Sequence, residues 1–141
     1  MGDKKILNHL ILLFFLLFAV FNLSAQGKYL DDLKTKVSDL DASFWNSYNT
    51  CDIDDMQKYF SSDLEFYHDK EGLTVGKVSM LNKVKEGLCS DKSKQLRREA
   101  LPETINIYSM DSYGAIIEGE HLFYFKEGEK DEVLVEKAKF I

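Results

Sequence analysis

The hydrophobic pattern of this chain changes its period near residue 90, and that change restricts the fold class. From residue 28 to residue 89 apolar residues recur mainly every three or four positions, which is the spacing of amphipathic helices. From residue 95 onward they lie in long extended runs separated by turn residues. Helices followed by a meander of strands predict an α+β domain in which a curved antiparallel sheet packs against the helices.

The expected helices and strands follow from the spacing of apolar residues and from capping and turn-forming residues between them. Helices are predicted at residues 28–49, in a short segment that starts at Ile53 behind the N-cap Asp52, and at residues 78–89. Strands are predicted, in chain order, at residues 64–68, 95–101, 104–110, 114–125 and 132–141. Pro102 has no N–H to donate to a ladder, so it marks a bulge or an edge kink between two of these strands.

The N-terminus has the composition of a cleavable signal peptide. Lys4 and Lys5 precede an apolar run over residues 6–21, which is shorter than the roughly 20 residues that span a bilayer. Small residues follow at Ser24 and Ala25, so residues 1–25 are predicted to be removed and residues 26–141 to form the mature domain. We expect export to the periplasm or the extracellular space, with membrane contact only through the leader; an uncleaved anchor is the alternative.

Length and charge limit the partners. The 116 residues that remain after cleavage suffice for one core. The whole chain carries a formal charge of −6, which becomes −7 once Asp3, Lys4 and Lys5 leave with the leader. A negative domain without clustered Lys and Arg disfavours nucleic acid and anionic membranes as partners.

Two cysteines, Cys51 and Cys89, remain in the mature chain. In an oxidising compartment such a pair tends to form a disulfide. Two buried free thiols are the alternative, because spacing alone does not give the Cα separation that a bridge requires.

Two histidines are expected on apolar faces of strands. Alternation places His121 beside Ile117 and Phe123, and His68 beside Leu64 and Phe66. Both imidazoles are therefore candidates for one pocket, as proton donors and acceptors; a hydrogen-bonded core histidine is the alternative for each.

Three further side chains are pocket candidates. Tyr67 and Asp69 flank His68 at a strand end, although alternation directs them to the opposite face, and Asp69 is also a turn former. The neighbours Arg97 and Arg98 point to opposite faces, so one could bind a carboxylate ligand while the other meets solvent or pairs with Glu99 or Glu118; Arg98 is the third pocket candidate.

Established catalytic signatures are missing from the sequence. It has no HExxH, CxxC, GxSxG, GxGxxG or GxxxxGK[ST] pattern. We therefore assign no metal, no cofactor and no catalytic residue from sequence.

Several segments together resemble a known superfamily. Glu65-Phe66-Tyr67-His68-Asp69, Leu96-Arg97-Arg98-Glu99 and Tyr113-Gly114-Ala115-Ile116 with Gly119-Glu120-His121 are similar to the nuclear-transport-factor-2-like (SnoaL-like, cystatin-like α+β) superfamily, in its exported branch of the domain-of-unknown-function-4440 type. The resemblance implies a cone of helices on a curved sheet with a cavity at one end. It also implies a final strand beyond Ile141, so an exposed edge and homodimerisation are expected.

We expect an exported, cone-shaped domain that binds a small molecule of unknown identity in a preformed pocket. One alternative is an acid–base isomerase or cyclase, the activity of some relatives that the resemblance implies, with His68 or His121 as base and Asp69 or Tyr67 as partner. Another is a structural or interaction module whose cavity is filled by its own aromatic rings, since the chain contains 10 Phe and 7 Tyr.

Overall fold

The computed structural model describes residues 27–141. The predicted signal peptide and its cleavage site lie outside these residues. The chain divides into two units, residues 1–36 and residues 37–141. In the first unit residues 27–36 are helical, and Thr35 Oγ1 donates to the carbonyl oxygen of Asp31 at 3.0 Å. Everything that follows concerns the second unit.

The second unit begins with a helix over residues 37–49, which continues the helical stretch that starts at residue 27. Cys51 has a φ of +55°, and Asp52 then caps the short helix α2 (Ile53–Met56) by accepting from the Asp55 N–H at 2.9 Å. A 3-10 turn, η1 (Gln57–Tyr59), completes this segment. Its Met56 is fully buried and anchors the segment in the core.

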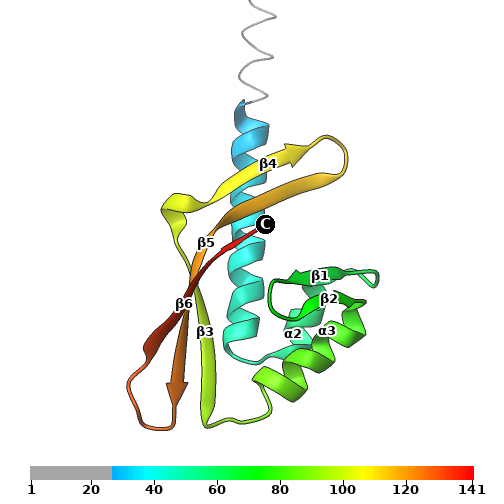
Figure 1. Ribbon diagram of the computed structural model, residues 1–141. Coiled ribbons are helices and arrows are strands. Elements are labelled where there is room, and N and C mark those ends of the chain that lie inside the picture. The colour runs from blue at the N-terminus through cyan, green and yellow to red at the C-terminus, as the bar shows by residue number, and fades with distance from the viewer. Residues whose placement is uncertain (1–26) are drawn as a thin grey trace, which may run out of the picture. The chain divides into compact units, whose positions relative to one another are not determined.

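Strands β1 (Glu65–His68) and β2 (Gly72–Val75) form a separate two-stranded antiparallel sheet (Figure 1). Gly72 has a φ of +75°, as the tight turn between them requires. The hairpin packs on α3 (Lys77–Lys83), which continues as one turn of π-helix, η2 (Val84–Leu88). Val84, at 5% exposure, is the second fully apolar core residue of this unit.

The main sheet has four antiparallel strands built around β5 (Gly114–Glu127). One side of β5 pairs first with β4 (Asn106–Met110) and then with β3 (Lys94–Ala100); the other side pairs with β6 (Val133–Phe140). In this register Arg98 lies opposite Phe123, and Ala100 lies opposite His121. The side chains of these four residues therefore lie on the same face of the sheet.

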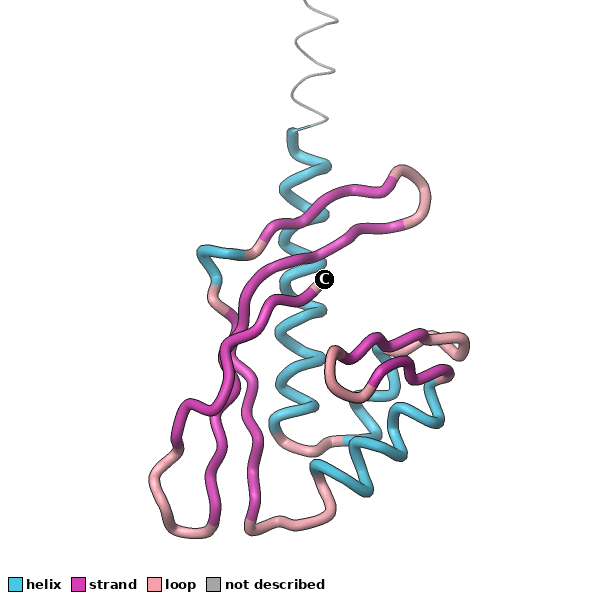
Figure 2. Tube along the Cα trace, in the orientation of Figure 1, coloured by secondary structure: helices cyan, strands magenta, loops and turns pink. Residues whose placement is uncertain are grey.

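The bend between β3 and β4 has a defined cause. The 3-10 turn η3 (Pro102–Thr104) separates the two strands along one edge of β5 (Figure 2). There the Thr104 hydroxyl replaces a ladder partner, accepting from the Glu120 N–H at 2.8 Å. Gly119 lies opposite this turn, and a Cβ at that position would come within 2.6 Å of Ile105 Cδ1. A larger residue at this position would therefore force the end of the Ile105 side chain to move.

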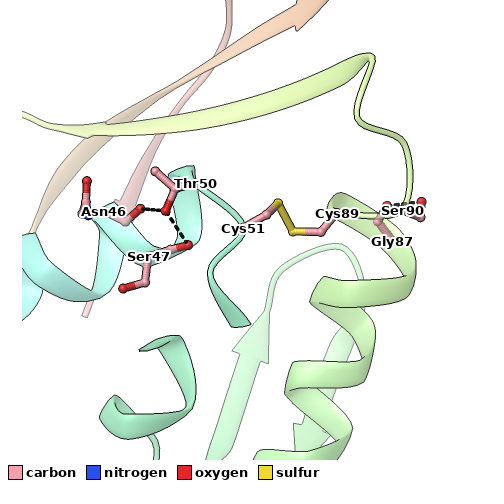
Figure 3. The surroundings of a disulfide bond; sticks show 7 residues. All are labelled: Asn46, Ser47, Thr50, Cys51, Gly87, Cys89 and Ser90. Carbon is pink, nitrogen blue, oxygen red and sulfur yellow. Dashed lines mark hydrogen bonds between the residues drawn. A yellow bond between two sulfur atoms is a disulfide. The ribbon is translucent and has the colours of Figure 1, made fainter. Parts of the chain in front are cut away.

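A disulfide joins Cys51, after the first helix, to Cys89, after the π-helical turn (Figure 3). Their Cα atoms are 5.8 Å apart, within the range that a bridge requires. The bond closes a loop with a sequence separation of 38 residues. In the chain-entropy model such a closure stabilises the folded state by about 4 kcal/mol. Of the two alternatives left open by the sequence, the structure has the bridge.

The predicted fold class is confirmed: helices precede an antiparallel sheet. The predicted strands agree with the observed ones to within two residues, and the kink at Pro102 is a 3-10 turn. The third helix differs in kind, because its last turn is π-helical. Within residues 27–141 no helix is both long enough and apolar enough to cross a membrane.

Candidate functional site

The candidate site is centred on Arg98, a charged residue that is only 4% exposed. Strand β3 directs its side chain toward the helix, and Asn49 fixes the strand there. The Asn49 amide nitrogen donates to the Arg98 carbonyl oxygen at 2.9 Å, and the Arg98 N–H donates to Asn49 Oδ1 at 2.8 Å. This reciprocal pair replaces a ladder partner and ties the end of the helix to β3.

Two protein acceptors bind the guanidinium of Arg98. Its Nη1 donates to Asp41 Oδ2 at 3.1 Å, and its Nε donates to His121 Nδ1 at 3.2 Å. Asp41 is itself oriented by the indole N–H of Trp45, which donates to Asp41 Oδ1 at 3.0 Å. Asp41 compensates this buried cation in part, but burial is the larger effect and lowers the pKa of Arg98 below its usual value.

Aromatic rings cover the guanidinium. The Cζ of Arg98 lies 4.4 Å from the ring centre of Trp45 and 4.8 Å from that of Phe140. His121 stacks on Phe140 with ring centres 5.0 Å apart. Cation–π contacts of this kind are strongest where water is excluded.

One nitrogen of Arg98 has no partner within residues 27–141. Its Nη2 is buried and finds no hydrogen-bond acceptor among the described residues. An unsatisfied buried donor of a charged group costs free energy, so a site that leaves one unpaired is suited to a ligand that supplies the acceptor.

Arg98 lines a groove between the helix and the bent edge of the sheet. The groove has a volume of about 470 Å³, and its lining combines polar and aliphatic side chains: Ser38, Asp41, Ala42, Trp45, Asn46, Asn49, Arg98, Ala100, Pro102, Ile105 and Ile117. All of these belong to the second unit. The volume is within the range of small-molecule sites.

The contact with Arg98 determines the proton position on His121. Arginine remains protonated, so Nδ1 of His121 must accept, and the proton of the neutral ring lies on Nε2. Burial, and then the charge of Arg98, lower the pKa of His121 below its ordinary value. His121 is therefore a neutral hydrogen-bond donor through Nε2 at neutral pH, rather than a base at that atom.

Tyr48 lies one helical turn from Trp45, and their rings are in edge contact at 5.0 Å between centres. Burial raises the pKa of Tyr48 to about 12. The phenol is thus neutral at any physiological pH and adds no charge to this region.

The other sequence candidates lie elsewhere. Tyr67 is 71% exposed on β1, and its hydroxyl donates to Glu65 at 2.6 Å. His68 Nδ1 accepts from the backbone N–H groups of Lys70 and Glu71 at 3.1 and 3.3 Å. Asp69 is exposed in the turn that follows. None of the three lines the groove, and His68 and His121 belong to different sheets.

The two neighbouring arginines take the opposite faces that alternation predicts. Arg97 is on the outer face, where it donates to Glu99 at 2.7 Å and to Glu132 at 2.8 and 2.9 Å. These carboxylates raise the pKa of Arg97 above its usual range, with Glu132 contributing most. Arg98 is on the inner face with His121. The structure thus brings together two of the five candidates, Arg98 and His121.

Sequence reasoning did not identify Asp41, Trp45, Asn49 or Phe140 as partners of Arg98. A helical signal for the first three exists: Asp41, Trp45 and Asn49 recur every four residues and share one helix face. Nothing in the sequence says that this polar stripe faces β3. Among residues 27–141 no three His, Cys, Asp or Glu side chains cluster as a metal site would require.

Comparisons with known proteins support the fold. No family model matches the chain, and no curated protein matches it in sequence. A solved structure of a protein from Catenulispora acidiphila is similar, with a TM-score of 0.67 and 13% sequence identity. The match covers 79% of this chain and 78% of that one. At this identity the similarity concerns the fold alone.

Proposed function

We propose that this domain binds a small organic molecule in the groove between the helix and the β3–β4 edge, with Arg98 as the polar anchor. The observation that carries the proposal is the buried Nη2 of Arg98, which finds no acceptor in the described part of the chain while its residue lines a groove of about 470 Å³. Small-molecule sites combine an apolar lining with a few fixed polar groups. Ala100, Ile105 and Ile117 supply such a lining here.

The polar groups are fixed before any ligand arrives. Asp41, His121 and Asn49 hold Arg98 through both its side chain and its backbone. A preorganised donor loses little conformational entropy on binding. The same fixation disfavours proton transfer by His121, since its Nδ1 is occupied and its Nε2 already carries the proton. Ligand binding is therefore preferred over acid–base catalysis.

Trp45 provides a direct test, because it is the only tryptophan of the chain and lines the groove. Its indole N–H gives one signal in a ¹H–¹⁵N NMR spectrum. We expect members of a library of small aliphatic fragments to shift that signal saturably. Ala42→Leu places a larger side chain in the groove lining and should abolish the shifts. Ser43→Leu, at an exposed neighbour that is not among the lining residues, should preserve them. A library that leaves the Trp45 signal unmoved contradicts the proposal.

We also propose that the protein is exported and belongs to the nuclear-transport-factor-2-like superfamily. The Cys51–Cys89 disulfide supports export, because such bonds persist in oxidising compartments. Helices followed by an antiparallel sheet support the superfamily. Mass spectrometry of protein recovered from the periplasm of an expressing bacterium tests export. We expect a chain that begins at Gln26 and is two hydrogens lighter than the reduced form. A full-length, reduced chain found only in the cytoplasm would contradict it.

A further inference from the structure

We infer that the groove selects ligands that present an uncharged hydroxyl group on an apolar body, and that it discriminates against carboxylates. This inference rests on the proposed function and names the ligand class of the same site. It is carried by the groups that surround the free Nη2 of Arg98.

The geometry of the guanidinium places any acceptor of Nη2 beside an existing acceptor. The group is planar, and Nη2 shares one edge with Nε and another with Nη1. Nε is occupied by His121 Nδ1 at 3.2 Å, and Nη1 by Asp41 Oδ2 at 3.1 Å. A ligand oxygen on Nη2 therefore lies next to a carboxylate oxygen or a nitrogen lone pair. The rings of Trp45 and Phe140 cover the guanidinium faces and favour approach at these edges.

The charge of Arg98 is already balanced. Asp41 forms an ion pair with it at 3.1 Å, and its carboxylate is largely buried, at 17% exposure. His121 adds no positive charge, since its ring is neutral with Nδ1 as an acceptor. A ligand carboxylate would lose its hydration and meet the Asp41 carboxylate at close range, where repulsion between like charges is weakly screened. An anion therefore gains little from this arginine.

A hydroxyl group fits both requirements. Its oxygen accepts from Nη2, and its hydrogen donates to a lone pair of Asp41 Oδ2 or of another neighbouring acceptor. The rest of the lining sets the character of the ligand body. It includes Ala42, Ala100, Pro102, Ile105 and Ile117, which offer apolar contact and no charge.

Cyclohexanol and cyclohexanecarboxylate are matched probes, because they share a ring and differ in the polar group. We expect cyclohexanol to shift the indole signal of Trp45 at concentrations at least about tenfold below those that cyclohexanecarboxylate needs at pH 7. Asp41→Asn removes the charge and keeps one side-chain oxygen, which can accept from Arg98 or from Trp45 but not at both of the positions that Oδ1 and Oδ2 occupy. In that variant the preference should shrink or reverse in favour of the carboxylate.

The outcomes separate the inference from the proposed function. Equal or tighter binding of the carboxylate by the unmodified protein overturns the hydroxyl inference and leaves small-molecule binding in place. An unchanged preference in a folded Asp41→Asn variant also overturns it, because Asp41 would then not be the source of discrimination. If neither these two probes nor the fragment library moves the Trp45 signal, both proposals fail. Heteronuclear spectra of each variant report directly whether it is folded.

Discussion

The β3–β5 region carries His121 and the β1–β2 hairpin carries His68, and alternation assigns both to apolar strand faces. The surroundings of the two imidazole rings nevertheless differ. His121 is 7% exposed, accepts from Arg98 and contacts the rings of Trp45, Phe123 and Phe140. The side chain of His68 is 36% exposed and accepts from backbone N–H groups of its own turn. A four-stranded sheet covered by a helix can bury a polar network, whereas a two-stranded hairpin leaves one face in water. The same sequence pattern therefore yields a site in one region and a turn in the other.

The largest difference should appear between the two neighbouring arginines. Arg98→Ala leaves the buried Asp41 carboxylate without its cation, so we expect the free energy of unfolding to fall by about 3–5 kcal/mol. Arg97→Ala removes ion pairs at the surface and should cost less than about 1 kcal/mol. Urea denaturation of both variants measures this. Similar losses for the two variants would contradict the distinction between inner and outer face.

The disulfide joins the end of the first helix, at Cys51, to the end of the π-helical turn that continues α3, at Cys89. We expect the double variant Cys51→Ser, Cys89→Ser to lose about 3–4 kcal/mol of unfolding free energy, by release of loop closure. The unmodified protein measured with and without reductant is the control, since reduction should reproduce the loss. A stability that is insensitive to both changes would show that the bridge does not constrain the unfolded chain.

The β1–β2 hairpin also contains a buried polar group without a partner, and removing this group should raise the stability of the protein. Thr74 is 5% exposed, and its hydroxyl has no hydrogen-bond partner among the described residues. Thr74→Val keeps the shape and removes the hydroxyl, so we expect a gain of about 1 kcal/mol in chemical denaturation. Val75→Thr, at a position 57% exposed, should change stability by less than about 0.5 kcal/mol. Destabilisation by Thr74→Val would indicate that the hydroxyl is satisfied.

The smallest expected effect is a pH dependence from His121. Burial and the charge of Arg98 lower its pKa in the folded state, so the unfolded chain binds a proton first as the pH falls. This contribution to stability is complete above about pH 6.5 and declines as the pH falls from there toward the folded-state pKa. His121→Gln should flatten the stability profile between pH 7.5 and 5.5 by up to about 1 kcal/mol. Coincident profiles for the two proteins would contradict the lowered pKa.

Much of the fold follows from local pattern. The helix over residues 27–49, strand β5 and the interruption at Pro102 are all visible in the spacing of apolar residues and in one missing N–H. The π-helical end of α3 is not, because one extra residue per turn leaves no clear mark on a short apolar stripe.

The sequence by itself determined the order of elements, the inward face of β5 that holds His121, and the opposite directions of Arg97 and Arg98. These properties depend on backbone periodicity, which acts over a few residues. Tertiary structure alone decided that Arg98 meets Asp41, 57 residues earlier in the chain, and that Phe140 and Trp45 cover it. It also decided that His68 forms hydrogen bonds with the backbone of its own turn and does not line the groove. Which side chains meet across a helix and a sheet depends on register, twist and burial of the whole domain, and no local period encodes those.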